Sequence, residues 1–197
     1  MQACRLAATD LACRRGDRVL FQGLSLALNA GAALQVAGPN GVGKSSLLRV
    51  LAGLLVPLHG HVERQGATGL IDERAALDPH LPLDRALAFW GRFDAVTAEP
   101  YAQLGLAGLG DVPVRYLSTG QRKRAALARL LGQVAPIWLL DEPLNGLDRA
   151  GAALVETLAA EHCAGGGICV IASHQAFALP GMDTLELAQF SPQEGPS

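Results

Sequence analysis

The residues from Gly38 to Ser45 have the types and the spacing that bind nucleotide phosphates. Their order, Gly38-Pro39-Asn40-Gly41-Val42-Gly43-Lys44-Ser45, fits the P-loop pattern G-x-x-x-x-G-K-[ST] at every fixed position. The glycines let the backbone curl so that successive N–H groups point at phosphate oxygens, and a helix N-terminus favours the negative charge. Lys44 can then bridge the outer phosphates, and the Ser45 hydroxyl can ligate Mg2+. We place Ser46, which follows directly, in the same nucleotide site.

Two acidic residues and a histidine follow apolar runs later in the chain. Asp141 and Glu142 come directly after residues 137–140, and His174 follows residues 168–173. Asp141 can hold Mg2+ through water beside Ser45, Glu142 can act as general base on the attacking water, and His174 can contact the γ-phosphate. The alternative is structural: an Asp-Glu pair that caps a strand, and a histidine that fills a strand end.

The elements around these residues predict an α/β fold. We expect strands over 33–37, 137–140 and 168–172, and helices over 46–52 and 152–161. Strands that alternate with helices favour a mostly parallel sheet, and ligands bind at the carboxyl ends of its strands. The P-loop, the Asp-Glu pair and His174 all lie at such ends. This coincidence is stronger support for a site than any one motif.

The rest of the chain predicts smaller elements. We expect short strands over 19–21 and 24–28, followed by a turn that carries His59 and His61 in solvent. We expect helices over 83–93 and 98–106, and a further helix that is capped by Ser118 and runs to Leu131. The last residues, 190–197, are expected to form a loose tail. Residues 1–197 form a single domain in this interpretation. The region from about 72 to 130 is an inserted helical subdomain.

Charge and composition exclude several classes. The 197 residues carry a net charge of −2, which argues against a nucleic-acid surface built on bulk charge, and we expect no nucleic-acid partner. No apolar run reaches the roughly 18 residues of a membrane helix, and the first residues do not resemble a signal peptide.

We expect the four cysteines to be free thiols. Most of the basic residues Arg122, Lys123, Arg124 and Arg129 are expected to form a solvated helix face.

A second anion site is predicted at Leu117-Ser118-Thr119-Gly120-Gln121. The Ser118 hydroxyl and the Gly120 N–H would lie at a helix start. The helical insert separates this site from the P-loop of the same chain. Two chains arranged head to tail could each offer it to the nucleotide of the other.

The order of these motifs resembles the ATP-binding cassette of ABC transporters over about residues 6–175. The P-loop corresponds to the Walker A motif. The signature motif corresponds to Ser118, Thr119, Gly120 and Gln121, and the Walker B motif corresponds to Leu140-Asp141-Glu142-Pro143. Asp148 corresponds to the D-loop, and His174 corresponds to the switch histidine. The resemblance implies a P-loop NTPase fold with a mostly parallel sheet, a small antiparallel β subdomain and the helical insert. It also implies ATP and Mg2+ as cofactors and a homodimer that closes on two ATP and drives a membrane subunit.

A narrower resemblance is to the ATP-binding subunits of the cytochrome c biogenesis system, the haem exporter. It depends on the absence of a regulatory extension, on residues 105–109 and 111–114, on Leu117 to Arg124, and on Ser173-His174-Gln175. It implies a peripheral position on the cytoplasmic side of the bacterial inner membrane, beside an integral membrane partner, with haem export as the inferred task.

Three positions depart from the usual cassette pattern. Thr119 replaces the second signature glycine, so we expect an ordinary backbone conformation there. Arg14 or Arg15 stands where an aromatic residue usually stacks on adenine, and a guanidinium can also stack on a base. Asp72-Glu73-Arg74 occupies the neighbourhood of the expected glutamine, so that a water or Glu73 would replace one Mg2+ contact.

Other P-loop functions fit less well. A soluble ABC ATPase that acts on DNA or ribosomes usually carries a coiled-coil insert or a second cassette. A GTPase would need N-K-x-D, which is absent. A small-molecule kinase would not need Leu117 to Gln121 before Asp141 and Glu142. Another small-substrate ABC exporter remains the main alternative.

Overall fold

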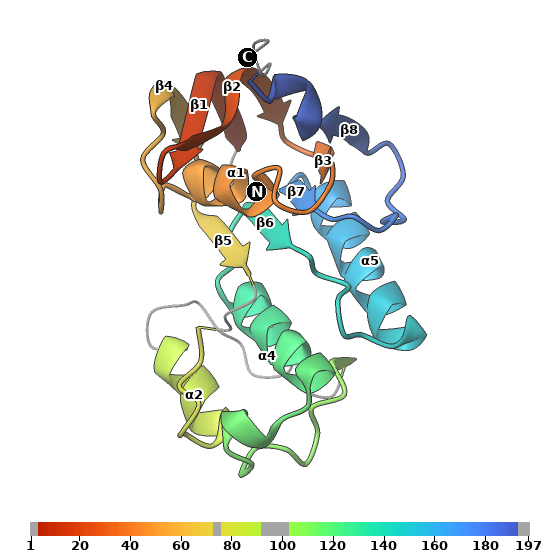
Figure 1. Cartoon of the computed structure of the whole chain (residues 1–197). Helices are drawn as coiled ribbons and strands as arrows, with labels where there is room; N and C mark the ends of the chain where they lie inside the picture. The colour runs from red at the N-terminus through yellow and green to blue at the C-terminus, as the bar shows by residue number, and fades with distance from the viewer. Residues whose placement is uncertain (1–3, 73–75, 92–102, 193–197) are drawn as a thin grey trace.

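The computed structural model describes residues 4–72, 76–91 and 103–192. The strands are β1 (Arg5–Arg15), β2 (Arg18–Asn29), β3 (Ala33–Ala37), β4 (His59–Gln65), β5 (Thr68–Ile71), β6 (Ile137–Asp141), β7 (Ile168–Ala172) and β8 (Asp183–Glu186). The helices are α1 (Lys44–Ala52), α2 (Leu83–Trp90), α4 (Thr119–Gly132) and α5 (Arg149–Ala164), with short 3-10 helices η1 (Val114–Tyr116) and η2 (Leu187–Phe190). Figure 1 shows their arrangement.

A parallel sheet forms the centre of the molecule and confirms the predicted α/β class. Its strand order is β5-β6-β7-β3-β8, and every neighbouring pair runs parallel. All residues of β6 and β7 are buried. In β6, Trp138 and Leu140 pack into one core cluster, whereas Ile137 and Leu139 pack into the other. A strand covered on both faces is apolar throughout, which explains the continuous apolar runs in the sequence.

A separate antiparallel sheet has the order β2-β1-β4 and packs over α1. The expectation of two short strands over 19–28 was wrong, because β2 runs without interruption from Arg18 to Asn29. Gly23, the apparent break, adopts φ 72° inside the strand, opposite an irregular part of β1. His59 and His61 lie on β4 and not in a turn. Both are exposed, as expected.

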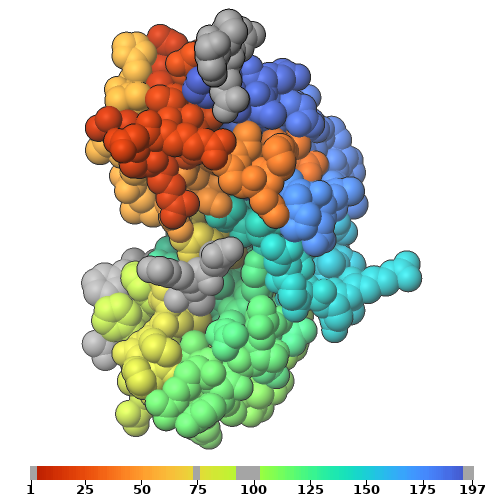
Figure 2. All heavy atoms as spheres, viewed as in Figure 1, coloured from red at the N-terminus to blue at the C-terminus, as the bar shows by residue number. Residues whose placement is uncertain are grey.

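The helices between β5 and β6 form a distinct lobe, which Figure 2 shows in yellow and green. The lobe shares one core cluster with a face of the parallel sheet, through residues such as Leu83, Leu106 and Leu127. The helix expected over 83–93 ends earlier, at Trp90, with Gly91 as its cap. Residues 98–102 of the other expected helix lie outside the described part, and the boundaries 72–130 stay a prediction.

The C-terminal part contains two elements that the sequence did not predict. Strand β8 pairs with β3 at the sheet edge, and η2 follows it. Phe190, the first residue of the expected loose tail, ends η2 and packs against the core, whereas 193–197 lie outside the described residues. Within the described ranges, no helix combines the length and the hydropathy that a membrane span requires.

Candidate nucleotide-binding site

The P-loop connects β3 to α1 in a backbone conformation that requires glycine. Gly38, Gly41 and Gly43 have φ of 136°, 80° and 115°, a region that side chains strongly disfavour. Helix α1 begins at Lys44, two residues before the predicted start. The Lys44 ammonium is buried and donates to the carbonyl oxygens of Gly38 at 2.8 Å and Pro39 at 3.3 Å. The loop is therefore folded around its own lysine.

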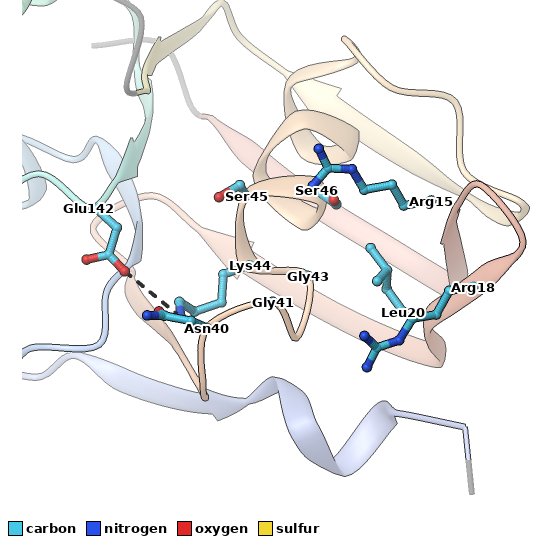
Figure 3. A pocket seen from close by; sticks show the side chains of 10 residues that line it. All are labelled: Arg15, Arg18, Leu20, Asn40, Gly41, Gly43, Lys44, Ser45, Ser46 and Glu142. Atoms are coloured by element: carbon cyan, nitrogen blue, oxygen red, sulfur yellow. Dashed lines mark ion pairs between the residues drawn. The ribbon is translucent and has the colours of Figure 1, made fainter. Parts of the chain in front are cut away.

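A cavity of about 420 Å³ opens beside this loop. Its lining residues come from the hairpin of β1 and β2, the P-loop with the start of α1, and the turn after β6: Arg15, Arg18, Leu20, Asn40, Gly41, Gly43, Lys44, Ser45, Ser46 and Glu142. Figure 3 shows Lys44 facing Glu142, while Arg15 and Arg18 lie beyond the P-loop on the other side of the pocket. The pocket thus has one end at the Lys44–Glu142 pair and a distal end at Arg15 and Arg18. Of the predicted loop residues, Gly38, Pro39 and Val42 support the loop without lining the cavity.

The predicted magnesium ligands meet at the carboxyl end of β6. Asp141 is 3 % exposed, and its Oδ1 has no hydrogen-bond partner among the described atoms. The pKa of the Asp141 carboxyl is raised, because the effect of burial is larger than the opposing effect of the side-chain hydrogen bond with Ser45. A bound divalent cation would satisfy the orphaned oxygen and stabilise the ionised carboxylate. The residues present therefore fit Mg2+, although the described chain holds no cluster of three acidic, His or Cys side chains that could bind a metal alone.

Glu142 is held in an uncommon backbone conformation at the end of the same strand. Its φ of 46° costs about 1–2 kcal/mol for a residue with a side chain. Its N–H donates to the Ala172 carbonyl at 2.8 Å. Its carboxylate lies 3.9 Å from the Lys44 ammonium through Oε1 and 2.9 Å from His174 Nδ1 through Oε2. The structure therefore brings the predicted general base, the P-loop lysine and the predicted switch histidine together.

The signature residues lie apart from this pocket. Ser118 caps α4: its hydroxyl accepts from the Gln121 N–H at 3.1 Å, and the Gln121 side chain accepts from the Ser118 N–H at 2.8 Å. Thr119 begins the helix with ordinary negative φ, which confirms that expectation. None of residues 118–121 lines the cavity. Asp148 caps α5 by accepting from the Gly151 N–H at 2.7 Å.

The basic residues of α4 do not form a solvated face, so that expectation was wrong. Arg122 donates to the Leu117 carbonyl at 2.9 Å, Lys123 donates to the Glu142 carbonyl, and Arg129 stacks over the Trp90 ring at 3.8 Å. The sequence does not predict these contacts, because the partner groups lie on other elements or just before the residue that caps α4.

The four cysteines are free thiols, as predicted; Cys163 alone is partly exposed.

The fold and this site define the chain as an ATP-binding cassette. Residues 21–145 match the family model described as ABC transporter, and the chain belongs to that family. The chain is 59% identical over 192 residues to the cytochrome c biogenesis ATP-binding export protein CcmA of Novosphingobium aromaticivorans, a match that covers 98% of this chain and all of that protein. The protein of the same name from Zymomonas mobilis is 50% identical, with 98% of this chain and 89% of the relative covered.

Solved structures agree with this assignment. A transporter assigned to the metal-chelate type of ABC transporters, in an inward-facing conformation, superimposes with a TM-score of 0.72 at 27% identity and covers 87% of this chain and 74% of its own. An ATP-binding protein assigned to an ABC transporter of Pyrococcus furiosus superimposes with a TM-score of 0.80 at 21% identity, over 95% of this chain and all of its own, and shows the same fold.

The distal end of the pocket yields a prediction about base binding. Arg15 lines the cavity, whereas Arg14 does not, so the structure favours Arg15 for stacking on the base. We expect Arg15→Ala to weaken ATP binding about tenfold, the loss of one stacking cation. Titration with a fluorescent ATP analogue measures this. Arg14→Ala, the matched control, should bind as the unaltered chain does. Equal affinity of both variants would contradict the assignment.

Proposed function

We propose that this chain binds ATP with Mg2+ and hydrolyses it as the ATPase subunit of an ABC transporter that serves c-type cytochrome biogenesis. The observation that carries the proposal is that Lys44 and Glu142 line the same pocket and lie 3.9 Å apart. The match to a relative named CcmA covers 98% of this chain. Relatives of that name support the biogenesis task, and the family supports the ATPase activity.

Each residue of the site has a task in this reaction. The P-loop amides and Lys44 would bind the β- and γ-phosphates, and the lysine would exchange its loop carbonyls for phosphate oxygens. Ser45 and Asp141 would hold Mg2+, which neutralises phosphate charge. Glu142 would accept a proton from the attacking water. His174, 2.9 Å from the Glu142 carboxylate, would keep that carboxylate and the water in line with the γ-phosphate.

A homodimer completes the proposed site. The cavity beside the P-loop is open and contains none of Ser118 to Gln121, although their helix start is suited to bind an anion. In a head-to-tail pair, Ser118 and Gly120 of each chain would contact the γ-phosphate held by the other, and Asp148 would lie at the same junction. ATP would then join the two chains, and its hydrolysis would release them.

The membrane partner and the location follow from the narrower resemblance. An integral membrane subunit would convert dimer closure into movement of a substrate, with haem as the proposed substrate. The chain would then lie peripherally on the cytoplasmic side of the bacterial inner membrane. Another small-substrate ABC exporter is the alternative, because the site described here handles ATP and not the transported molecule.

Purification from membranes tests this proposal. In a bacterium that carries a tagged copy in place of its own, the tag should recover an integral membrane protein, and mass spectrometry should identify it as a cytochrome c biogenesis subunit. Deletion of the gene should remove covalently bound haem from c-type cytochromes, as detected by haem staining after denaturing electrophoresis. Normal c-type cytochromes in the deletion strain, with a membrane subunit of another transporter recovered, would support the alternative.

A further inference from the structure

Lys123 contacts the backbone of the proposed general base from a different element. It lies in the second turn of α4, is partly buried, and donates from its ammonium to the Glu142 carbonyl oxygen. The same oxygen also accepts from the Asn145 N–H at 3.3 Å. A charged donor makes the stronger of such hydrogen bonds. Both polar backbone groups of Glu142 are therefore occupied, the N–H by β7 and the carbonyl by α4 and its own turn.

The conformation of Glu142 makes this contact consequential. A residue with φ of 46° keeps that conformation only where its surroundings impose it. The direction of the carboxylate depends on this conformation, because the side chain leaves from the same Cα. The Lys44 and His174 contacts act on the carboxylate itself. Within the described residues, Lys123 is the side chain that holds the backbone carbonyl.

The contact between Lys123 and Glu142 lies where α4 packs closely against the turn that follows Glu142. A methyl group at Gly146 would lie 2.8 Å from Thr119 Cγ2, and one at Gly120 would lie 3.1 Å from the Gly146 carbonyl oxygen. Thr119, Gly120 and Lys123 are spaced so that one side of the helix meets this turn. Figure 1 shows the start of α4 near the connection from β6 to α5. A rotation of α4 would therefore move Lys123 relative to Glu142.

We propose that Lys123 is a positioning residue for the hydrolytic reaction, which holds the Glu142 backbone so that the carboxylate faces the γ-phosphate. This inference depends on the proposed function, in which Glu142 is the general base. It links the helix that carries Ser118 to Gln121 with the base in the same chain. The orientation of α4 would thereby affect how fast that chain hydrolyses its own ATP.

Variants at this position separate positioning from binding. Lys123→Met keeps an unbranched apolar stem of similar length and removes the charged donor, whereas Lys123→Arg keeps a donor. We expect Lys123→Met to lower kcat at least about tenfold, because small displacements of a reacting group are costly, with KM for ATP within about twofold. Lys123→Arg should recover most of the rate. Arg85→Met, which removes an exposed cation from α2, should match the unaltered chain.

The outcomes distinguish this inference from the proposed function. In a Glu142→Gln background, Lys123→Met should cause no further loss, because the base that it positions is gone. Normal turnover in Glu142→Gln alone would overturn the proposed function. An inactive Glu142→Gln beside a fully active Lys123→Met would overturn only the inference. Loss of ATP binding in Lys123→Met, or failure of Lys123→Arg to recover the rate, would assign Lys123 a structural role and also overturn it.

Discussion

Replacing Glu142 by Gln should nearly abolish ATP hydrolysis while ATP still binds. The amide has almost the same shape as the carboxylate and can keep a contact with His174, but it cannot accept a proton from water. General-base catalysis contributes roughly 10²–10⁴ in rate, so we expect kcat to fall by at least about 100-fold. Single-turnover hydrolysis of radiolabelled ATP measures this loss, and nucleotide titration measures the affinity.

The same variant should accumulate as an ATP-bound dimer, because in the proposed homodimer closure would need the nucleotide and release would need its hydrolysis. Size-exclusion chromatography with light scattering, with and without ATP and Mg2+, would show the change in mass. Glu156→Gln is the matched control: its carboxylate lies on α5, accepts from the Ala178 N–H and does not line the pocket. Hydrolysis at the normal rate in Glu142→Gln would contradict the role of the carboxylate.

Replacing Lys44 by Ala should remove much of the affinity for ATP. The buried ammonium lies between the Gly38 and Pro39 carbonyls and 3.9 Å from Glu142, at the place where the outer phosphates would enter. A hydrogen bond to a charged group contributes about 1.5–3 kcal/mol, so its loss should weaken ATP binding about ten- to hundredfold. Isothermal titration calorimetry with ATP and Mg2+ would measure the difference.

The control for Lys44→Ala must exclude a collapsed P-loop. Thermal unfolding should show a folded protein, and AMP, which lacks the outer phosphates, should bind Lys44→Ala and the unaltered chain equally. Arg14→Ala removes one cation from the hairpin without altering the pocket lining and should leave ATP binding unchanged. Tight ATP binding by Lys44→Ala would show that the lysine does not meet the phosphates.

Local patterns in the sequence were sufficient for much of the fold. The continuous apolar runs at 137–140 and 168–172 predicted strands covered on both faces, and the structure confirms β6 and β7. The failures concern segments that strand pairing holds in place despite a weak local pattern, whether the partner strand is distant, as for β8, or adjacent, as for β2. Strand β8 has a weak pattern and exists because it pairs with β3, and β2 crosses Gly23 because β1 holds it on both sides of that residue.

The chemical types and the spacing at Gly38 to Ser45, Asp141, Glu142 and His174 determined the class of protein and the proposed reaction, because phosphate binding needs a specific local backbone and specific side chains. The tertiary structure alone decided which of Arg14 and Arg15 faces the pocket, that Glu142 adopts φ of 46°, and that Lys123 reaches its carbonyl from α4. The physical reason is distance along the chain. Hydrogen bonds and packing across 19 or more positions depend on how whole elements dock, and no local pattern records that docking.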